Sequence, residues 1–188
     1  MTSTPDDSDP PNVPLPADQG RNIEAVHALA WRHLLETHPG TLQALADEAA
    51  LQLGGTAEAL GEGTTISPTG HCGSDLFVIC QQCGGDRAVL ELKGPKAWVN
   101  WLKTKNTWQT IHYRETYRAN PPLACHHLRL PGPLLILLDA KNRTRQVIEQ
   151  TEGRGEPFLD GWAVLRYEQV LSRQPFSSHR LAAWLLGR

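Results

Sequence analysis

Apolar residues recur every three or four positions between residues 23 and 53, which is the spacing of one face of an α-helix. Pro39-Gly40 interrupts this stretch, so the pattern predicts two helices. The first runs from Asn22 to Pro39, and the second runs from an N-cap at Thr41 to Leu53. Gly54-Gly55 is a typical stop for the second helix. Residues 54–74 contain several Gly and Thr residues and one Pro, and are interpreted as a connector.

Two short runs, residues 75–80 and 87–93, have the apolar and β-branched composition of strands. The sequence QQCGGD between them is typical of a turn, so the two runs predict a β-hairpin. The later part of the chain predicts a helix, three strands and a closing helix, at residues 95–118, 134–138, 146–149, 162–166 and 178–186. The run 134–138 is continuously apolar, which indicates a central strand covered on both faces. The order of these helices and strands along the chain predicts an α/β fold with a mixed central sheet flanked by helices.

The first 20 residues differ in composition from the rest of the chain. They contain five Pro and four Asp and neither Lys nor Arg, which is typical of a disordered tail. The remaining residues, 21–188, fit one domain of ordinary size. The chain has no run of about 18 apolar residues and no basic, apolar leader, so we expect a cytoplasmic protein.

Charge is concentrated in the middle of the chain. The formal net charge is −2, but residues 87–118 carry seven basic and two acidic side chains, with Trp98, Trp101 and Trp108 interleaved. Lys and Arg neutralise phosphates, and aromatic rings stack on unpaired bases. The candidate nucleic-acid contacts are Lys96, Lys103, Lys105, Arg114 and Arg118. The alternative is an amphipathic helix with its Trp residues in the core and its lysines in water.

The predicted hairpin also carries a candidate catalytic cluster. If its turn is centred on Cys83, Asp75 lies directly opposite Glu91, where Cβ atoms are roughly 4.5–5.5 Å apart. Two carboxylates at that distance repel unless a cation lies between them, and a hard ion such as Mg²⁺ prefers oxygen ligands. Lys93 shares a strand face with Glu91, so it could orient or help to deprotonate a metal-bound water.

This Asp…Glu-x-Lys pattern on a hairpin resembles the PD-(D/E)XK nuclease superfamily, whose members have the restriction-endonuclease-like fold. Gln109-Thr-Ile-His-Tyr113 resembles the QxxxY element of the RecB-type members, 16 residues after Lys93. The resemblance covers roughly residues 22–140. It departs from the family where Gly73-Ser74 precede Asp75 in place of the usual Pro.

The resemblance implies a PD-(D/E)XK nuclease-like domain over residues 21–188. It also implies a metal-dependent deoxyribonuclease that hydrolyses DNA and leaves 5′-phosphate ends. Asp75 and Glu91 would hold Mg²⁺ or Mn²⁺, with Glu48 as a further candidate ligand. The implied catalytic residues are Asp75, Glu91, Lys93, Gln109 and Tyr113. Three histidines are candidates for the N-terminal His of RecB-type members: His27, His33 and His38.

Cys80 and Cys83 have the C-x₂-C spacing of a zinc knuckle. The candidates for the other two ligands are His71, Cys72, Cys125, His126 and His127, of which the Cys125-His126-His127 segment, with Cys125 and His127 as its ligands, could reach the hairpin turn most easily. Structural Zn²⁺, free thiols and an iron–sulfur cluster remain open for these residues. Two other functions also remain open: a non-catalytic nucleic-acid-binding module, and an interaction subunit of a defence or repair complex. Either would keep the same fold, and a homodimer is a further expectation.

Overall fold

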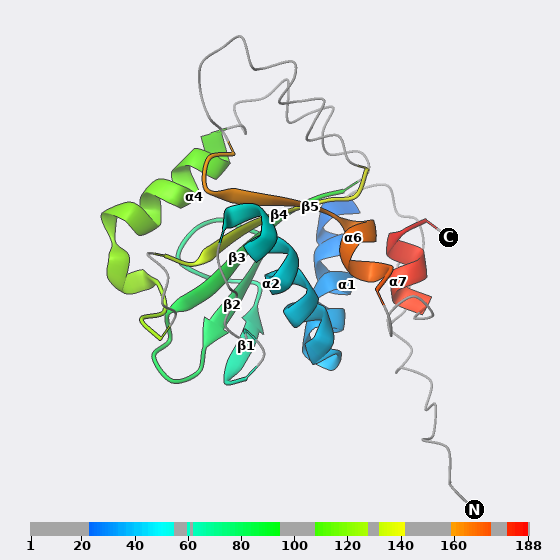
Figure 1. Ribbon diagram of the computed structural model, residues 1–188, viewed down its shortest axis with the longest axis horizontal. Coiled ribbons are helices and arrows are strands. Elements are labelled where there is room, and N and C mark those ends of the chain that lie inside the picture. The colour runs from blue at the N-terminus through cyan, green and yellow to red at the C-terminus, as the bar shows by residue number, and fades with distance from the viewer. Residues whose placement is uncertain are drawn as a thin grey trace, which may run out of the picture.

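A five-stranded sheet with the order β1-β2-β3-β4-β5 forms the centre of the computed structural model, with helices on both faces (Figure 1). The structure describes residues 23–54, 60, 62–94, 108–127, 132–141, 159–173 and 180–187. The strands are β1 (Thr64–Ser67), β2 (Leu76–Cys80), β3 (Asp86–Lys93), β4 (Leu134–Asp139) and β5 (Trp162–Arg166). The helices are α1 (Ile23–Thr37), α2 (Pro39–Leu53), α4 (Trp108–Ala119), η2 (Pro121–Leu123, a 3-10 helix), α6 (Tyr167–Leu171) and α7 (Arg180–Leu185).

The sheet is mixed, as the sequence predicts. Strands β1, β2 and β3 are antiparallel neighbours, whereas β4 is parallel to β3 and β5 is parallel to β4. Parallel neighbours need a crossover connection, and α4 lies between β3 and β4 along the chain. All six residues of β4 are buried, which confirms the central position expected from its apolar sequence.

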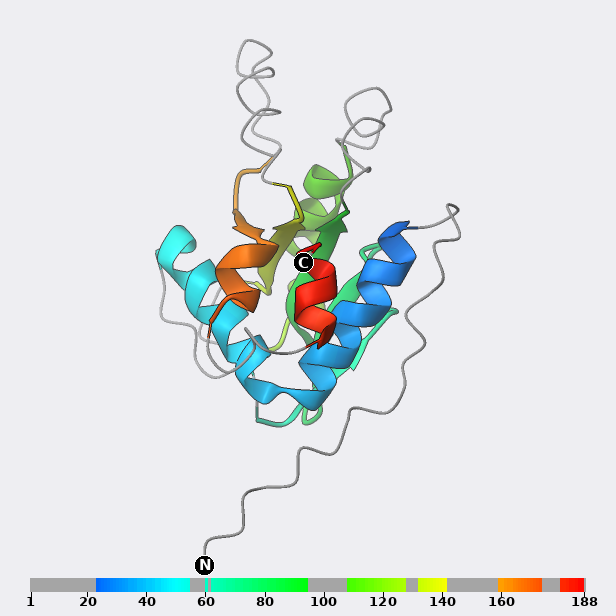
Figure 2. The same ribbon diagram turned by 90° about the vertical axis from the view of Figure 1, so that its right-hand side faces the viewer.

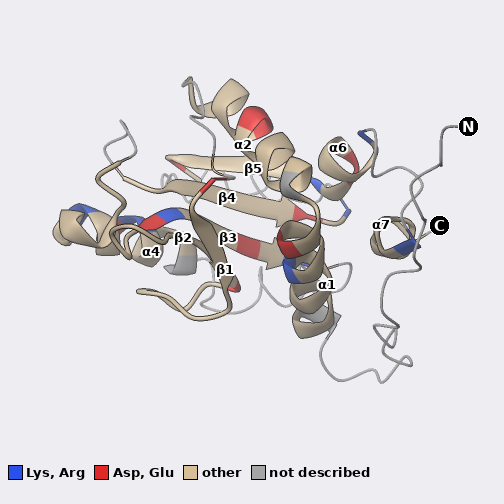
Figure 3. Cartoon of the chain, turned by 90° about the horizontal axis from the view of Figure 1, so that it is seen from below, with Lys and Arg blue, Asp and Glu red and all other residues tan. Residues whose placement is uncertain are grey.

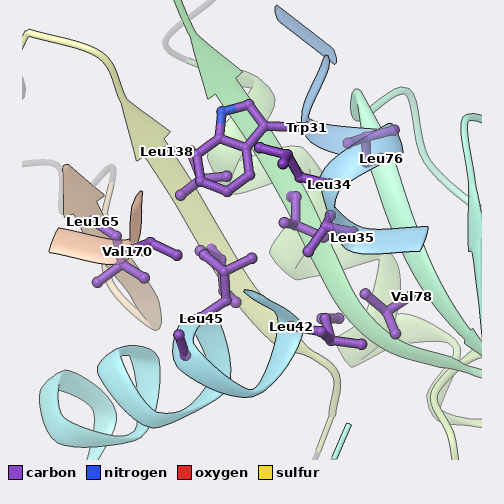
Figure 4. Packing of buried hydrophobic residues seen from close by; sticks show 14 of the residues in the cluster. Trp31, Leu34, Leu35, Leu42, Leu45, Leu76, Val78, Leu138, Leu165 and Val170 are labelled. Atoms are coloured by element: carbon purple, nitrogen blue, oxygen red, sulfur yellow. The ribbon is translucent and has the colours of Figure 1, made fainter. Parts of the chain in front are cut away.

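One face of the sheet, the α1/α2 face, carries the larger hydrophobic core. Helices α1, α2, α6 and α7 cover it side by side (Figure 2). Successive side chains of a strand point to opposite faces, and Leu90 and Leu92 of β3 point into this core. Figure 4 labels ten of its members: Trp31, Leu34, Leu35, Leu42, Leu45, Leu76, Val78, Leu138, Leu165 and Val170.

The opposite face, the α4 face, is covered by α4 and has a smaller, more aromatic core. Tyr113 and Tyr117 of α4 pack there with Phe77, Val89 and other strand residues. The hydroxyl of Tyr117 donates a 2.5 Å hydrogen bond to Oδ2 of the buried Asp86. Together with burial, this bond raises the pKa of Tyr117. The helix is therefore anchored to the sheet by a buried polar contact as well as by its rings.

Two expectations about the elements need correction, and one short helix was not predicted. Thr41 is not an N-cap, because α2 begins at Pro39 and its N-cap is His38; a Pro in the first turn suits the helical φ. Part of the expected connector forms the strand β1, and the short helix α6 follows β5 directly. The strand expected at residues 146–149 and the tail at residues 1–20 lie outside the described residues. Among the described helices, none is long and apolar enough to span a membrane.

Truncation of one core leucine tests the packing of α2. Leu45 is fully buried in the α1/α2 face, whereas Leu51 of the same helix is 77% exposed. We expect Leu45→Ala to lower the free energy of unfolding by about 2–5 kcal/mol, since it removes buried methyl groups and leaves a cavity. We expect Leu51→Ala to change it by less than about 0.5 kcal/mol. Urea unfolding followed by circular dichroism measures both, and similar losses in the two variants would contradict this packing.

A buried histidine makes stability depend on pH. Nδ1 of His27 lies 3.2 Å from the Tyr167 hydroxyl, and burial lowers the pKa of His27 from its usual 6.5. Its contribution to stability is therefore present above pH 6.5. That contribution is lost as the pH falls toward the folded-state pKa, because the unfolded chain takes up a proton that the folded chain does not. We expect a slope of at most about 1.4 kcal/mol per pH unit.

Replacing the imidazole removes this dependence. In His27→Phe, which keeps a ring against Tyr167 and Trp184, the free energy of unfolding should fall less between pH 7.5 and pH 5.5 than in the wild type. Urea unfolding at the two pH values measures the difference, and equal slopes for the two proteins would contradict the role given to His27.

Candidate functional site

The register of the β2–β3 hairpin brings the predicted carboxylates together. Leu76 pairs with Leu90, which is the register expected from a turn centred on Cys83, and Asp75 is the residue just before Leu76. The Oδ2 atom of Asp75 accepts a 2.7 Å hydrogen bond from the backbone N–H of Leu92. This bond holds the Asp75 carboxylate against the segment Glu91-Leu92-Lys93. Asp75 and Glu91 are therefore neighbours at the end of the hairpin away from its turn.

Glu91 and Lys93 form an ion pair on the α4 face. The Nζ atom of Lys93 lies 2.6 Å from Oε1 of Glu91, and each side chain is only 5% exposed. Ser74, also buried, donates from Oγ to Oε2 of Glu91 at 3.1 Å and to the carbonyl of Leu90 at 2.7 Å. Burying two charges is costly, so their placement among apolar strand residues points to a role other than solubility.

Tyr113 approaches the same cluster from α4. Its hydroxyl lies close to Gly73, where an added Cβ would be 3.6 Å away. Burial raises the pKa of Tyr113, and the negative charges of Glu91, Cys72 and Asp75 raise it further. The phenol therefore stays protonated over the physiological pH range and can act as a neutral hydrogen-bond donor.

The structure adds Asp139, which the sequence reasoning missed. Asp139 is the last residue of β4, is fully buried and pairs in register with Lys93. Directly paired residues of parallel strands point to the same face, so Asp139 shares the α4 face with Lys93. Figure 3 shows β3 and β4 side by side, with acidic positions in red on both strands. An acid directly after a run of five buried apolar residues is the signal that could have found it.

Glu48 is not brought to this cluster. Its helix α2 packs on the α1/α2 face, and the Glu48 carboxylate pairs with Arg173. Gln109 lies in α4, one turn before Tyr113. No described residue is close enough to Asp75 and Glu91 to form with them a group of three His, Cys, Asp or Glu ligand atoms within 4.8 Å of one another.

The described basic residues of the proposed nucleic-acid surface are already paired. Arg114 and Arg118 both contact Glu115 and Asp160. Acidic partners reduce the charge that these arginines can offer to a phosphate backbone. The three candidate lysines, Lys96, Lys103 and Lys105, lie outside the described residues.

A second cluster lies at the turn end of the hairpin. The Sγ atoms of Cys80, Cys83 and Cys125 are all within 4.8 Å of one another, so these residues could bind a metal ion such as zinc. Cys83 is also within 4.8 Å of a ring nitrogen of His126 and of His127. The structure thus brings together the three cysteines that the sequence offered as candidate ligands, Cys80, Cys83 and Cys125.

The environment of Cys80 favours its thiolate. Burial opposes ionisation of Cys80, but hydrogen bonds from the backbone amides of Cys83 and Gln82 and from the Arg87 side chain outweigh it. They lower the pKa of the Cys80 thiol to about 6. The Nη2 atom of Arg87 lies 3.4 Å from this sulfur. Cys72, by contrast, packs on the α4 face, away from the three clustered thiols.

Comparison with known proteins adds no family. No family model, curated protein or solved structure matches this chain.

Proposed function

We propose that the protein is a metal-dependent nuclease that hydrolyses DNA phosphodiester bonds and leaves 5′-phosphate ends. One observation supports this proposal above the others. Asp75, Glu91 and Lys93 lie close together at one end of the hairpin, and Glu91 and Lys93 form a buried ion pair. An acidic pair beside a lysine on one strand face is the arrangement that the resemblance to PD-(D/E)XK nucleases requires. The mixed sheet flanked by helices is compatible with a restriction-endonuclease-like fold.

The donor set of this cluster suits Mg²⁺ or Mn²⁺. Asp75 and Glu91 offer carboxylate oxygens, which hard divalent ions prefer, and two such side chains leave room for water and phosphate ligands. A divalent ion held there would polarise a phosphate oxygen and lower the pKa of a bound water. The ammonium group of Lys93 supplies a positive charge beside Glu91.

The remaining residues would act on the substrate through hydrogen bonds. Lys93, once released from Glu91, would orient the attacking water or contact a phosphate oxygen. Tyr113 would donate its hydroxyl proton in a hydrogen bond to the phosphate, because its raised pKa keeps it protonated. Ser74 would hold Glu91 in place. Gln109, one turn before Tyr113 on α4, would support the same contacts.

A cleavage assay tests this function. The full chain is incubated with single- and double-stranded DNA in the presence of Mg²⁺, Mn²⁺ or EDTA, and the ends of the products are analysed. We expect cleavage with either metal ion, none with EDTA, and 5′-phosphate ends. DNA that is bound but left intact with both metal ions would instead favour a non-catalytic nucleic-acid-binding module. A protein indifferent to DNA would favour an interaction subunit.

A further inference from the structure

We propose that Cys80, Cys83, Cys125 and His127 hold one structural zinc ion at the turn of the β2–β3 hairpin. The geometry of the sulfur atoms is the first argument. Two thiolates that bind one zinc ion lie about 2.3 Å from it, and tetrahedral coordination then places them about 3.8 Å apart. The Sγ atoms of Cys83 and Cys125 are 3.6 Å apart, and Cys80 completes a mutual group of three.

The hairpin turn prepares the first two sulfur atoms for a metal ion. The backbone amides of Gln82 and Cys83 donate to Sγ of Cys80, and the amide of Gly85 donates to Sγ of Cys83. Gly84 adopts a φ of 70°, which favours glycine. Amides that point at sulfur stabilise thiolates, and thiolates are the form that binds metal ions. For Cys83, burial and the neighbouring cysteines outweigh the Gly85 amide and raise the pKa of its thiol, so Cys80 is the sulfur that this turn favours as a thiolate.

The backbone also carries Cys125 to this turn from 42 residues away along the chain. The N–H of Cys125 donates a 2.9 Å hydrogen bond to the carbonyl of Asp86, and Ala124 forms a parallel bridge with Asp86. Gly85 permits this approach, because an added Cβ would lie only 2.7 Å from the carbonyl oxygen of Ala124. The third ligand is therefore positioned by main-chain contacts and not by a side-chain rotamer alone.

His127 is the expected fourth ligand. His126 and His127 both have a ring nitrogen within 4.8 Å of Cys83 Sγ, and both are exposed, so either ring can turn without breaking core packing. Only His127 is separated from Cys125 by an intervening residue. Adjacent ligands on one ion would close a short, strained ring, whereas one intervening residue lets the backbone bend around the ion.

Charge balance supports the same occupant. Three thiolates and one neutral imidazole around Zn²⁺ carry a net charge of −1, and the Arg87 guanidinium donates to Cys80 Sγ. Arg87 is the extra residue where the β2–β3 register shifts near the turn. The irregularity in the strand thus turns a cation toward the sulfur cluster.

A disulfide and an iron–sulfur cluster fit these residues less well than a zinc ion does. A disulfide between Cys83 and Cys125 would need their sulfur atoms to close from 3.6 Å to about 2.05 Å, and it would leave Cys80 unused. An iron–sulfur cluster commonly takes four cysteine ligands, but Cys72 lies on the α4 face and not with the other three. Zinc alone uses all three thiols and an available histidine.

This site is separate from the proposed nuclease centre. Asp75 and Cys80 lie at opposite ends of β2, roughly 17 Å apart at the usual rise of a strand. A zinc ion bound by Cys80, Cys83, Cys125 and His127 would link the hairpin turn to the segment that follows η2. Its presence is therefore testable without any reference to DNA cleavage.

Metal analysis of the purified full chain tests the proposal directly. We expect about one zinc ion per chain, and after exchange with Co²⁺ we expect the absorption of a tetrahedral cobalt–thiolate centre. Cys83→Ser should lose the metal, whereas Cys72→Ser should retain it as the matched control. A wild-type protein without bound metal, or with a Cys83–Cys125 disulfide in its peptide map, would overturn the proposal, as would full zinc content in Cys83→Ser.

The two neighbouring histidines give the test of the fourth ligand. We expect His127→Ala to weaken zinc affinity by more than about 100-fold, the upper end of what outer-shell partners contribute, and we expect His126→Ala to leave it nearly unchanged. Competition with a chromogenic chelator measures both affinities. Loss of affinity in His126→Ala but not in His127→Ala would overturn the assignment of His127.

Discussion

Replacement of Lys93 with Met is expected to lower the single-turnover rate of metal-dependent DNA cleavage by about 10²- to 10⁴-fold, the usual contribution of a positioned acid–base group. Met keeps most of the length and the apolar stem of the side chain but lacks the ammonium group. DNA affinity should change little, since one phosphate contact at most is lost. The rate is measured at saturating DNA, and Lys141→Met, which removes an exposed lysine, should cleave as the wild type does.

The same variant has a second, independent readout. Lys93→Met leaves Glu91 buried without its cation at 2.6 Å, and loss of one partner of a buried ion pair costs about 3–5 kcal/mol. Added Mg²⁺ should recover more stability in Lys93→Met than in the wild type, because the ion replaces the missing charge. Wild-type cleavage by Lys93→Met would remove Lys93 from the mechanism. An equal effect of Mg²⁺ on the stability of both proteins would count against a metal ion at Glu91.

Asp75→Asn is expected to lower metal-dependent cleavage by about 10³-fold or more, because metal-ion stabilisation of the transition state is worth several kcal/mol. Asn keeps a carbonyl oxygen that can accept the hydrogen bond from the Leu92 amide, so the hairpin should remain intact. Glu48→Gln is the matched acid-to-amide control, since Glu48 pairs with Arg173. Its cleavage rate should equal that of the wild type.

The comparison of these two variants also decides between two metal-ligand sets. A large loss in Glu48→Gln would place that carboxylate in the metal site, as the resemblance to PD-(D/E)XK nucleases allows. A large loss in Asp75→Asn alone would restrict the site to the hairpin. Similar rates in Asp75→Asn and the wild type would contradict the role given to Asp75.

The register at the open end of the hairpin agrees with the sequence prediction, although the turn alone does not determine it. Near the turn, Ile79 pairs with Asp86, and the register shift that leaves Arg87 as an extra residue gives the predicted pairing from Val78 onward. Leu76 accordingly pairs with Leu90. The proximity of Asp75 to Glu91 follows from this register.

Features that depend on long-range packing were harder to predict. β1 has only four residues, of which Ile66 alone is buried. Its alternation of apolar and polar residues is therefore too short to be distinguished from a loop. Asp139 joins Lys93 only because β4 pairs in parallel with β3, and no local pattern specifies that register. Cys125 was a candidate ligand from its residue type, but its approach to Cys83 depends on a bridge between Asp86 and Ala124 that no local pattern specifies.

Glu48 matched a candidate metal ligand of the family by residue type and position, but the fold places it elsewhere. The residue type and its position on an N-terminal helix suit a metal ligand, but the apolar face of α2 decides where its polar side chains point. Leu45 and Ala49 of α2 pack in the core of the α1/α2 face, and Glu48 is directed to Arg173. Helical periodicity predicted the helix itself but did not specify which strand or helix its polar face would meet.

Anomalous scattering of Mn²⁺ in crystals of the full chain would locate the metal ion of the proposed nuclease centre directly. We expect a peak about 2.1 Å from carboxylate oxygens of both Asp75 and Glu91, a distance typical of small, hard divalent ions. We also expect Lys93 Nζ to move away from Glu91 Oε1, which it contacts in the structure. An intact Glu91–Lys93 pair with no peak at the two carboxylates, at a Mn²⁺ concentration that saturates cleavage, would rule out this metal site.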